Sequence, residues 1–123
     1  MNASTLNLIA QTDSAFRREG DCWIGRCIIC NGPIRFERAT GEGATIEHII
    51  PRSLGGGNEP LNLGIAHLRC NAEKGRRWDP PRRHHARREQ YAALTDRMLR
   101  ERARRFRTAF GPDDSGSERS ASL

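Results

Sequence analysis

The stretch Thr45–Asn71, TIEHIIPRSLGGGNEPLNLGIAHLRCN, decides the fold of this 123-residue chain. It places Glu47 and His48 side by side in a short β-branched run, which is typical of a strand. A glycine-rich loop follows, and then come Asn62, a second histidine and a cysteine. A carboxylate is an oxygen ligand for Mg²⁺, and an imidazole can accept a proton near neutral pH. The pair has the chemistry that a metal-dependent phosphodiesterase needs, although such a pair alone is more often a solvated surface feature.

The geometry of a strand limits how this pair can act. Neighbouring residues on a regular strand point to opposite faces, so Glu47 and His48 share a target only where the strand ends or is distorted. Two asparagines lie downstream. The amide of Asn62 can bond backbone groups and hold a glycine loop, although a plain turn residue is the alternative. Asn71 can offer an amide oxygen to a metal, or can cap the helix that begins near Cys70.

Two pairs of metal-ligating residues bracket this stretch. In Cys27-x-x-Cys30 and His67-x-x-Cys70, a two-residue gap lets both side chains reach one tetrahedral ion. The alternative is two unrelated pairs of small buried residues. A Cys3His set is typical of structural zinc, and a chain with only 36% hydrophobic residues has a modest core that a metal would stabilise. We expect the remaining cysteine, Cys22, to be a small buried hydrophobe.

The charge balance indicates the class of partner. The formal net charge is +6, with a sequence pI of about 10.1, which favours nucleic acid, although a basic surface without a partner has the same composition. No apolar run approaches the ~20 residues of a membrane span, and the N-terminal residues lack the basic leader of a secretory signal. We therefore expect no membrane contact and a cytoplasmic location, in a bacterium or a phage-infected cell. Phage or bacterial origin follows from the small size and from an arginine bias in which Lys74 is the only lysine.

Four segments follow from the breaks in composition. The first, residues 1–19, is an extension with a short helix expected at residues 4–18, and the second contains every cysteine. Two consecutive prolines then separate the second segment from an arginine-rich helix, and a small polar tail follows that helix. The expected segments are 1–19 (N-terminal extension), 20–78 (central domain), 79–110 (arginine-rich C-terminal helix) and 111–123 (disordered tail).

The arginine-rich helix is expected at residues 83–110. One broad helical face carries its apolar residues, and arginines crowd the other faces. In one interpretation this helix docks on the small core and its arginines are solvated; in the other, the arginines contact DNA phosphates without reading sequence. A mixture of the two is expected. The apolar face comprises Tyr91, Leu94, Met98, Leu99, Ala103, Phe106 and Phe110.

These motifs resemble a known family. The segments CIIC and IEHIIPRSLGGGNEPLNLGIAHLRCNAEKG are similar to the HNH (His-Asn-His) endonucleases of the ββα-metal fold, in the subgroup with a zinc-knuckle frame. The resemblance runs from Cys27 to about Gly75. It rests on the acid-His pair, Ile-x-Pro, the glycine loop, Asn-Leu and Cys-Asn-x-x-Lys in the family's order. It implies an α+β fold: a small ββα-metal domain stapled by a Cys3His zinc site, flanked by N-terminal and C-terminal helices.

The resemblance also implies a role for each motif residue. His48 would be the general base, and Asn62 would brace the loop and orient that base through backbone contacts. Glu47 and Asn71 would hold the catalytic Mg²⁺ or Mn²⁺. The motif departs from the family at Glu47, one methylene longer than the commoner aspartate, and in its second knuckle, which is His-x-x-Cys where Cys-x-x-Cys is commoner. The structural zinc ligands would be Cys27, Cys30, His67 and Cys70.

The expected function is hydrolysis of phosphodiester bonds in double-stranded DNA by a divalent-metal-dependent endonuclease. One site cuts one strand, so a monomer would nick and a homodimer would break both strands; a phage or host DNA-processing partner is a further expectation. The alternative is a non-catalytic, zinc-dependent DNA-binding module. The expected DNA contacts are Arg52, Lys74, Arg76, Arg77, Arg82, Arg83, Arg87 and Arg88.

Overall fold

A computed structural model describes residues 3–77 and 85–108, without the side chains of residues 77 and 85–88. Three α-helices, five strands and two short 3₁₀ helices are found in these ranges. In chain order they are α1 (Ala3–Gln11), β1 (Arg17–Glu19), β2 (Cys22–Arg26), β3 (Pro33–Glu37), β4 (Thr45–His48), η1 (Arg52–Leu54), η2 (Pro60–Asn62), β5 (Leu63–Ala66), α2 (Leu68–Arg77) and α3 (His85–Arg105). The mixed architecture confirms the predicted α+β class.

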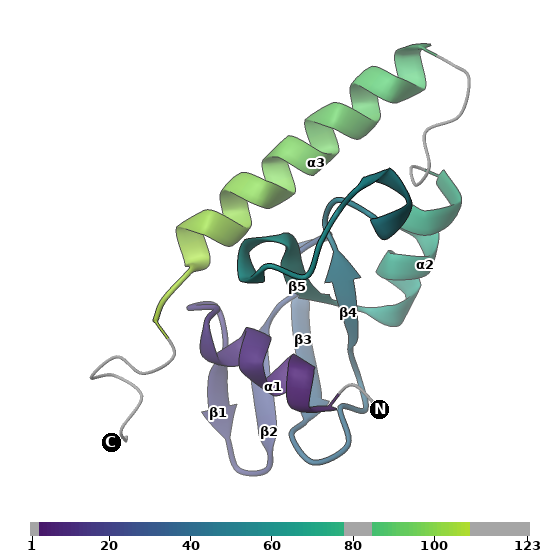
Figure 1. The fold of residues 1–123 in the computed structure, drawn as a ribbon. Helices are drawn as coiled ribbons and strands as arrows, with labels where there is room; N and C mark the ends of the chain where they lie inside the picture. Colours follow the sequence, from purple (N-terminus) through teal and green to yellow (C-terminus); the bar gives the residue numbers. More distant parts are fainter. Residues whose placement is uncertain (1–2, 78–84, 109–123) are drawn as a thin grey trace.

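Two small antiparallel sheets form the framework (Figure 1). The first has the order β1-β2-β3, and the second is the β4–β5 hairpin. In the hairpin, Glu47 pairs with Gly64 and His48 pairs with Leu63, so His48 is the last residue of its strand. Helix α2 begins two residues after β5 and contacts β4. Strands β4 and β5 with helix α2 therefore make the ββα unit that carries the motif.

The buried residues form two clusters that meet at β5, all four residues of which are buried. The first cluster lies under α1 and includes Phe16 and Phe36, whose rings meet edge to face with centroids 6.2 Å apart. The second contains Cys27, Ile28, Ile49, Ala66 and Met98. Because β5 is buried on both faces, its sequence is a near-continuous apolar run and does not alternate between apolar and polar residues.

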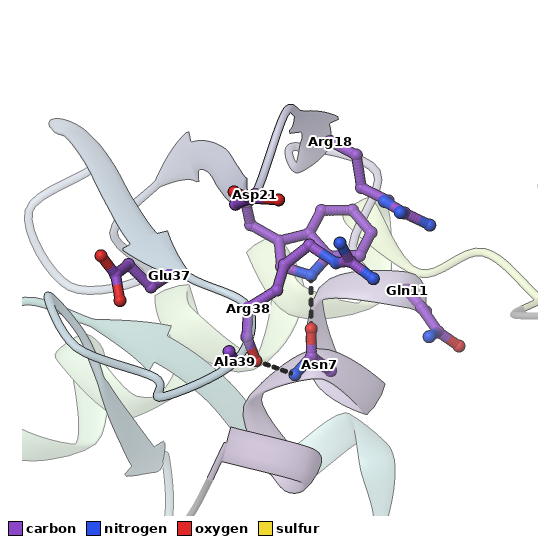
Figure 2. A pocket seen from close by; sticks show the side chains of 8 residues that line it. Asn7, Gln11, Arg18, Asp21, Glu37, Arg38 and Ala39 are labelled. Atoms are coloured by element: carbon purple, nitrogen blue, oxygen red, sulfur yellow. Dashed lines mark hydrogen bonds between the residues drawn. The ribbon is translucent and has the colours of Figure 1, made fainter.

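Helix α1 ends earlier than the expected residue 18. It ends at Gln11, and Phe16 reaches the core from the turn that follows. The side chain of Asn7 fastens the helix to the three-stranded sheet, because its Oδ1 accepts a bond from the indole of Trp23 at 2.8 Å (Figure 2). Its Nδ2 donates to the carbonyl of Arg38 at 2.8 Å. Arg18, Arg38, Asp21 and Glu37 line the same hollow, where their opposite charges balance.

Helix α3 lies along the loop that joins the hairpin strands, where it contacts η2 (Figure 1). Met98 is fully buried, as its place on the apolar face predicts, whereas Ala103 and Phe106 are exposed. Arg102 and Arg105 are buried, although most arginines of this helix were expected on its other faces. No helix within residues 3–77 and 85–108 is long and apolar enough to cross a membrane.

The two buried arginines donate hydrogen bonds to backbone and side-chain groups of the domain. Arg102 donates to the carbonyls of Leu63 and Thr12 at 2.7 and 2.8 Å, and to the Thr12 hydroxyl at 2.7 Å. Arg105 donates to the carbonyl of Arg26 and to the side chain of Asn31. A guanidinium group has five donors in a fixed fork, which suits this cross-linking. The helix is therefore docked on the domain through its arginines as well as through its apolar residues.

Candidate functional site

Cys27, Cys30, His67 and Cys70 form one cluster in which the four ligand atoms all lie within 4.8 Å of one another. The first two residues follow β2, whereas His67 lies between β5 and α2 and Cys70 lies in the first turn of α2. Tetrahedral zinc with bonds of about 2.3 Å places its ligand sulfurs about 3.8 Å apart, close to this spacing. The cluster thus has the donor set and dimensions that a closed zinc site requires.

The protonation chemistry of the cluster also suits a cation. Burial and the neighbouring thiols raise the pKa of Cys70 to about 12, so a nearby cation would favour its thiolate form. At Cys30, burial opposes ionisation, but hydrogen bonds from Gly32 and from the other cluster residues lower the pKa to about 7. The Cys27 sulfur accepts bonds from the backbone N–H groups of Ile29 and Cys30 at 3.4 and 3.5 Å.

The ring of His67 is oriented toward these sulfurs. Its Nε2 lies 2.8 Å from the carbonyl of Pro33, which can only accept, so Nε2 carries the proton. The unprotonated Nδ1 lies 3.4 Å from the Cys30 sulfur and 3.6 Å from the Cys70 sulfur. A backbone carbonyl that fixes the second ring nitrogen is typical of a metal-binding histidine.

Glu47 points from β4 toward α2 and is 2% exposed. Asn71 donates from Nδ2 to its Oε1 at 2.6 Å, and the Lys74 ammonium lies 2.8 Å from its Oε2. Lys74 also lies 3.5 Å from the carbonyl of His48 and is 1% exposed. The two residues that the motif assigns to a catalytic metal are therefore in contact, and a positive charge already lies beside the carboxylate.

His48 is directed to the other side of the strand end. It lines a cleft of about 570 Å³ between α1 and the loop after β4. Its Nε2 lies 2.8 Å from Oδ1 of Asn58. Arg52 and Arg102 are the charged residues among those that line the cleft, whose walls are otherwise largely aliphatic. Glu47 and His48 therefore point to opposite faces, as expected of neighbours on a strand, and β4 ends at His48.

Asn62 organises the glycine loop between the two strands. Its Oδ1 accepts from the Ile50 amide at 2.8 Å, and its Nδ2 donates to the carbonyls of Ile50 and Gly57 at 3.1 and 2.9 Å. Gly55 adopts a φ of +92°, which favours glycine, and ends η1. A Cβ on Gly56 would lie 1.7 Å from the Ile50 carbonyl oxygen, so the loop closes only with glycine there. The loop is held by its own asparagine and by close backbone approach.

The residues expected to contact DNA have different environments. Arg52 is exposed and lines the cleft, and Arg76 is exposed beside Glu73. Lys74 is buried against Glu47, so its ammonium is directed into the domain rather than toward a phosphate outside it. Arg82 and Arg83 lie outside the described residues, as does the 111–123 tail. The same holds for the side chains of Arg77, Arg87 and Arg88.

Three contributions to this site were not expected from the sequence. Asn58 carried no signal beyond its place after three glycines, and Arg102 is one arginine among many in its helix. The ion pair of Lys74 has only a weak signal in the sequence. Lys74 lies three residues after Asn71 on the same helix, and residues at this spacing share a face. Cys22 is buried in β2 and lies outside the Cys3His cluster.

Residues 27–87 match the family model described as HNH endonuclease. This segment belongs to the HNH endonuclease family. No curated protein and no solved structure matches the chain. The HNH domain includes the zinc-type cluster, Glu47, His48, Asn62 and Asn71, whereas α1 and most of α3 lie outside the matched residues.

Proposed function

We propose that this HNH protein is a divalent-metal-dependent endonuclease that hydrolyses phosphodiester bonds of double-stranded DNA. The observation that carries the proposal is the end of β4, where Glu47 meets Asn71 on one side and His48 opens into a cleft on the other. His48 acts as the general base that takes a proton from the attacking water. A carboxylate and a base are thus held at adjacent positions of one hairpin.

Glu47 and Asn71 would hold the Mg²⁺ or Mn²⁺. Carboxylate and amide oxygens are ligands that these hard cations accept. The Glu47 carboxylate already stabilises one positive charge, that of Lys74. Lys74 has to withdraw from Glu47 for a cation to bind both carboxylate oxygens. When bound, the cation would offset negative charge that develops on the phosphate.

The Cys3His cluster would hold a structural zinc ion. Its four protein ligands leave no open position for a reacting water. Cys70 lies in the first turn of α2, directly before Asn71, so a metal at the cluster fixes the start of the helix that carries Asn71. Zinc would therefore support the active site without taking part in the reaction.

Phosphate contacts would come from the basic surface around the cleft. Arg52 lies at the cleft and Arg76 is exposed on α2, on a chain with a net charge of +6. Such contacts add affinity and salt dependence without reading sequence. One site cuts one strand, so a monomer nicks and a dimer makes double-strand breaks.

A second candidate function is a zinc-dependent DNA-binding module without cleavage. The observation that favours it is the ion pair between Glu47 and Lys74, which neutralises the carboxylate that would otherwise attract a divalent cation. What favours the enzyme is His48, because a binding module has no use for an imidazole held in an open cleft.

Incubation of supercoiled plasmid with the protein in Mg²⁺, Mn²⁺ or EDTA separates the two functions. The enzyme gives nicked plasmid as a monomer, or linear plasmid as a dimer, and EDTA suppresses both products. Gel-shift binding without a product in any metal identifies the binding module. His48→Ala, with its zinc content and thermal melting unchanged, shows that any nicking activity belongs to this site and not to a contaminant.

A further inference from the structure

The loop that faces His48 supplies a residue to which the motif assigns no role. We propose that Asn58 is a positioning residue for His48: its amide oxygen accepts the Nε2–H proton and leaves Nδ1 as the nitrogen that takes a proton from water. The inference rests on the proposed endonuclease function. It adds a residue to that site and specifies which ring atom reacts.

The contact itself carries the assignment. Nε2 of His48 lies 2.8 Å from Oδ1 of Asn58. An amide oxygen only accepts, and a neutral imidazole carries one N–H and one lone pair. The bond therefore places the proton on Nε2 and the lone pair on Nδ1, and it fixes the rotation of the ring. A base whose orienting partner is lost samples other tautomers and other rotations.

Asn58 is exposed, so the loop backbone has to hold it in position. The preceding residue, Gly57, provides this support, because its carbonyl accepts a bond from Nδ2 of Asn62 at 2.9 Å. The same amide bonds Ile50 just beyond the end of β4. Asn62 thus supports His48 indirectly. It bonds the backbone of Gly57, and the next residue, Asn58, contacts the ring.

An asparagine suits this place better than an aspartate would. The charged groups that line the cleft with His48 are Arg52 and Arg102, which favour an anionic phosphate. A carboxylate at position 58 would accept the same proton but would repel that phosphate. The amide orients the ring without adding negative charge.

Asn58→Leu, which has a similar volume and no acceptor, and Asn58→Asp, which keeps the acceptor, test the inference in steady-state plasmid nicking. Leu lowers kcat by about 10- to 100-fold, the usual cost of losing an orienting partner, and leaves KM nearly unchanged. Asp restores kcat toward the wild-type value and raises KM. Glu59→Gln, the next exposed loop residue, is the matched control and keeps wild-type kcat. The inference is overturned by wild-type kcat in the Leu variant, or by a kcat in the Asp variant as low as in the Leu variant.

The tautomer of His48 is a second readout, and it does not depend on cleavage. ¹⁵N NMR of the neutral ring gives the Nε2–H form in the wild type and a mixture in Asn58→Leu, with the signals assigned from His48→Asn. An Nδ1–H ring in the wild type, or no change in the Leu variant, contradicts the inference. If the wild-type protein fails to nick DNA, the proposed function fails, while the NMR result still decides the role of Asn58.

Discussion

His48 and His67 lie at opposite ends of the β4–β5 hairpin and are held by the same kind of bond. In each ring, Nε2 lies 2.8 Å from an oxygen, that of Asn58 in one case and that of Pro33 in the other. The two rings differ in the groups that surround them. Nδ1 of His67 faces two cysteine sulfurs, while His48 lines a cleft. The surroundings of each ring, and not the residue type, separate a candidate zinc ligand from a candidate base.

Disruption of the Cys3His cluster should have the largest effect, because it should unfold the domain and so also abolish the site around His48. Cys70→Ala, or treatment with a strong chelator, should unfold the domain. Structural zinc contributes about 10–16 kcal/mol in small zinc domains, as much as the whole stability of a typical protein. Circular dichroism and zinc analysis measure the loss. Cys22→Ala, outside the cluster, is the control and keeps its zinc; a folded Cys70→Ala protein with a full complement of zinc would disprove the role.

Substitution at the His48 end should affect cleavage alone. His48→Ala should slow plasmid nicking by about 10²- to 10⁴-fold, the usual contribution of a general base. Its melting temperature and zinc content should match the wild type. His67→Ala provides the contrast, because it should lose zinc, stability and nicking together. Equal nicking rates for His48→Ala and the wild type would remove His48 from the mechanism.

The ion pair under α2 lies between the two ends. Glu47→Gln should lower the free energy of unfolding by about 3–5 kcal/mol, because it leaves the buried Lys74 ammonium without its counter-charge. Urea unfolding measures the change, and the double variant with Lys74→Met should recover part of it. Glu73→Gln, whose partner Arg76 is exposed, should cost less than about 1 kcal/mol. Similar losses for the two glutamates would mean that the Glu47 pair is not buried in solution.

The contact of α3 with the cleft can be weakened without changing the Cys3His cluster. Arg102→Lys keeps the charge but cannot make all three bonds to Leu63 and Thr12. The loss of one charge-assisted bond should cost about 1.5–3 kcal/mol. Thermal unfolding measures the change, and zinc content should stay constant. Arg100→Lys, on the exposed side of the same helix, should be neutral, and an equally neutral Arg102→Lys would contradict the docking.

The smallest effect concerns DNA affinity at the cleft. If Arg52 contacts one phosphate, Arg52→Ala should reduce the slope of log affinity against log salt by about 0.9. Fluorescence anisotropy at several salt concentrations measures the slope. Arg100→Ala removes the same charge at an exposed position of α3 that does not line the cleft, and is the matched control. Equal slopes for the two variants would exclude a phosphate contact specific to Arg52.

The sequence predicts local features of the site better than contacts between distant elements. The two-residue gaps of the knuckles and the Glu47–His48 pair are local patterns, and motif spacing is enough to find them. The burial of Lys74 and Arg102 depends on how α2 and α3 pack, and no periodicity encodes which arginine of an arginine-rich helix turns inward. Asn58 lies in an irregular loop whose shape comes from the bonds of Asn62. A pattern in the sequence does not reveal that shape.

The bonds from Arg102 to Thr12 and Leu63 also set an order of assembly. Residues of α1 are made first on the ribosome, the His48 loop follows, and the guanidinium that ties them together is made some forty residues after Leu63. Between the synthesis of Leu63 and that of Arg102, the growing chain has the other residues of the cleft but not the arginine that bonds them together. The cleft is therefore completed only after the cysteines and the histidine of the cluster have all been made.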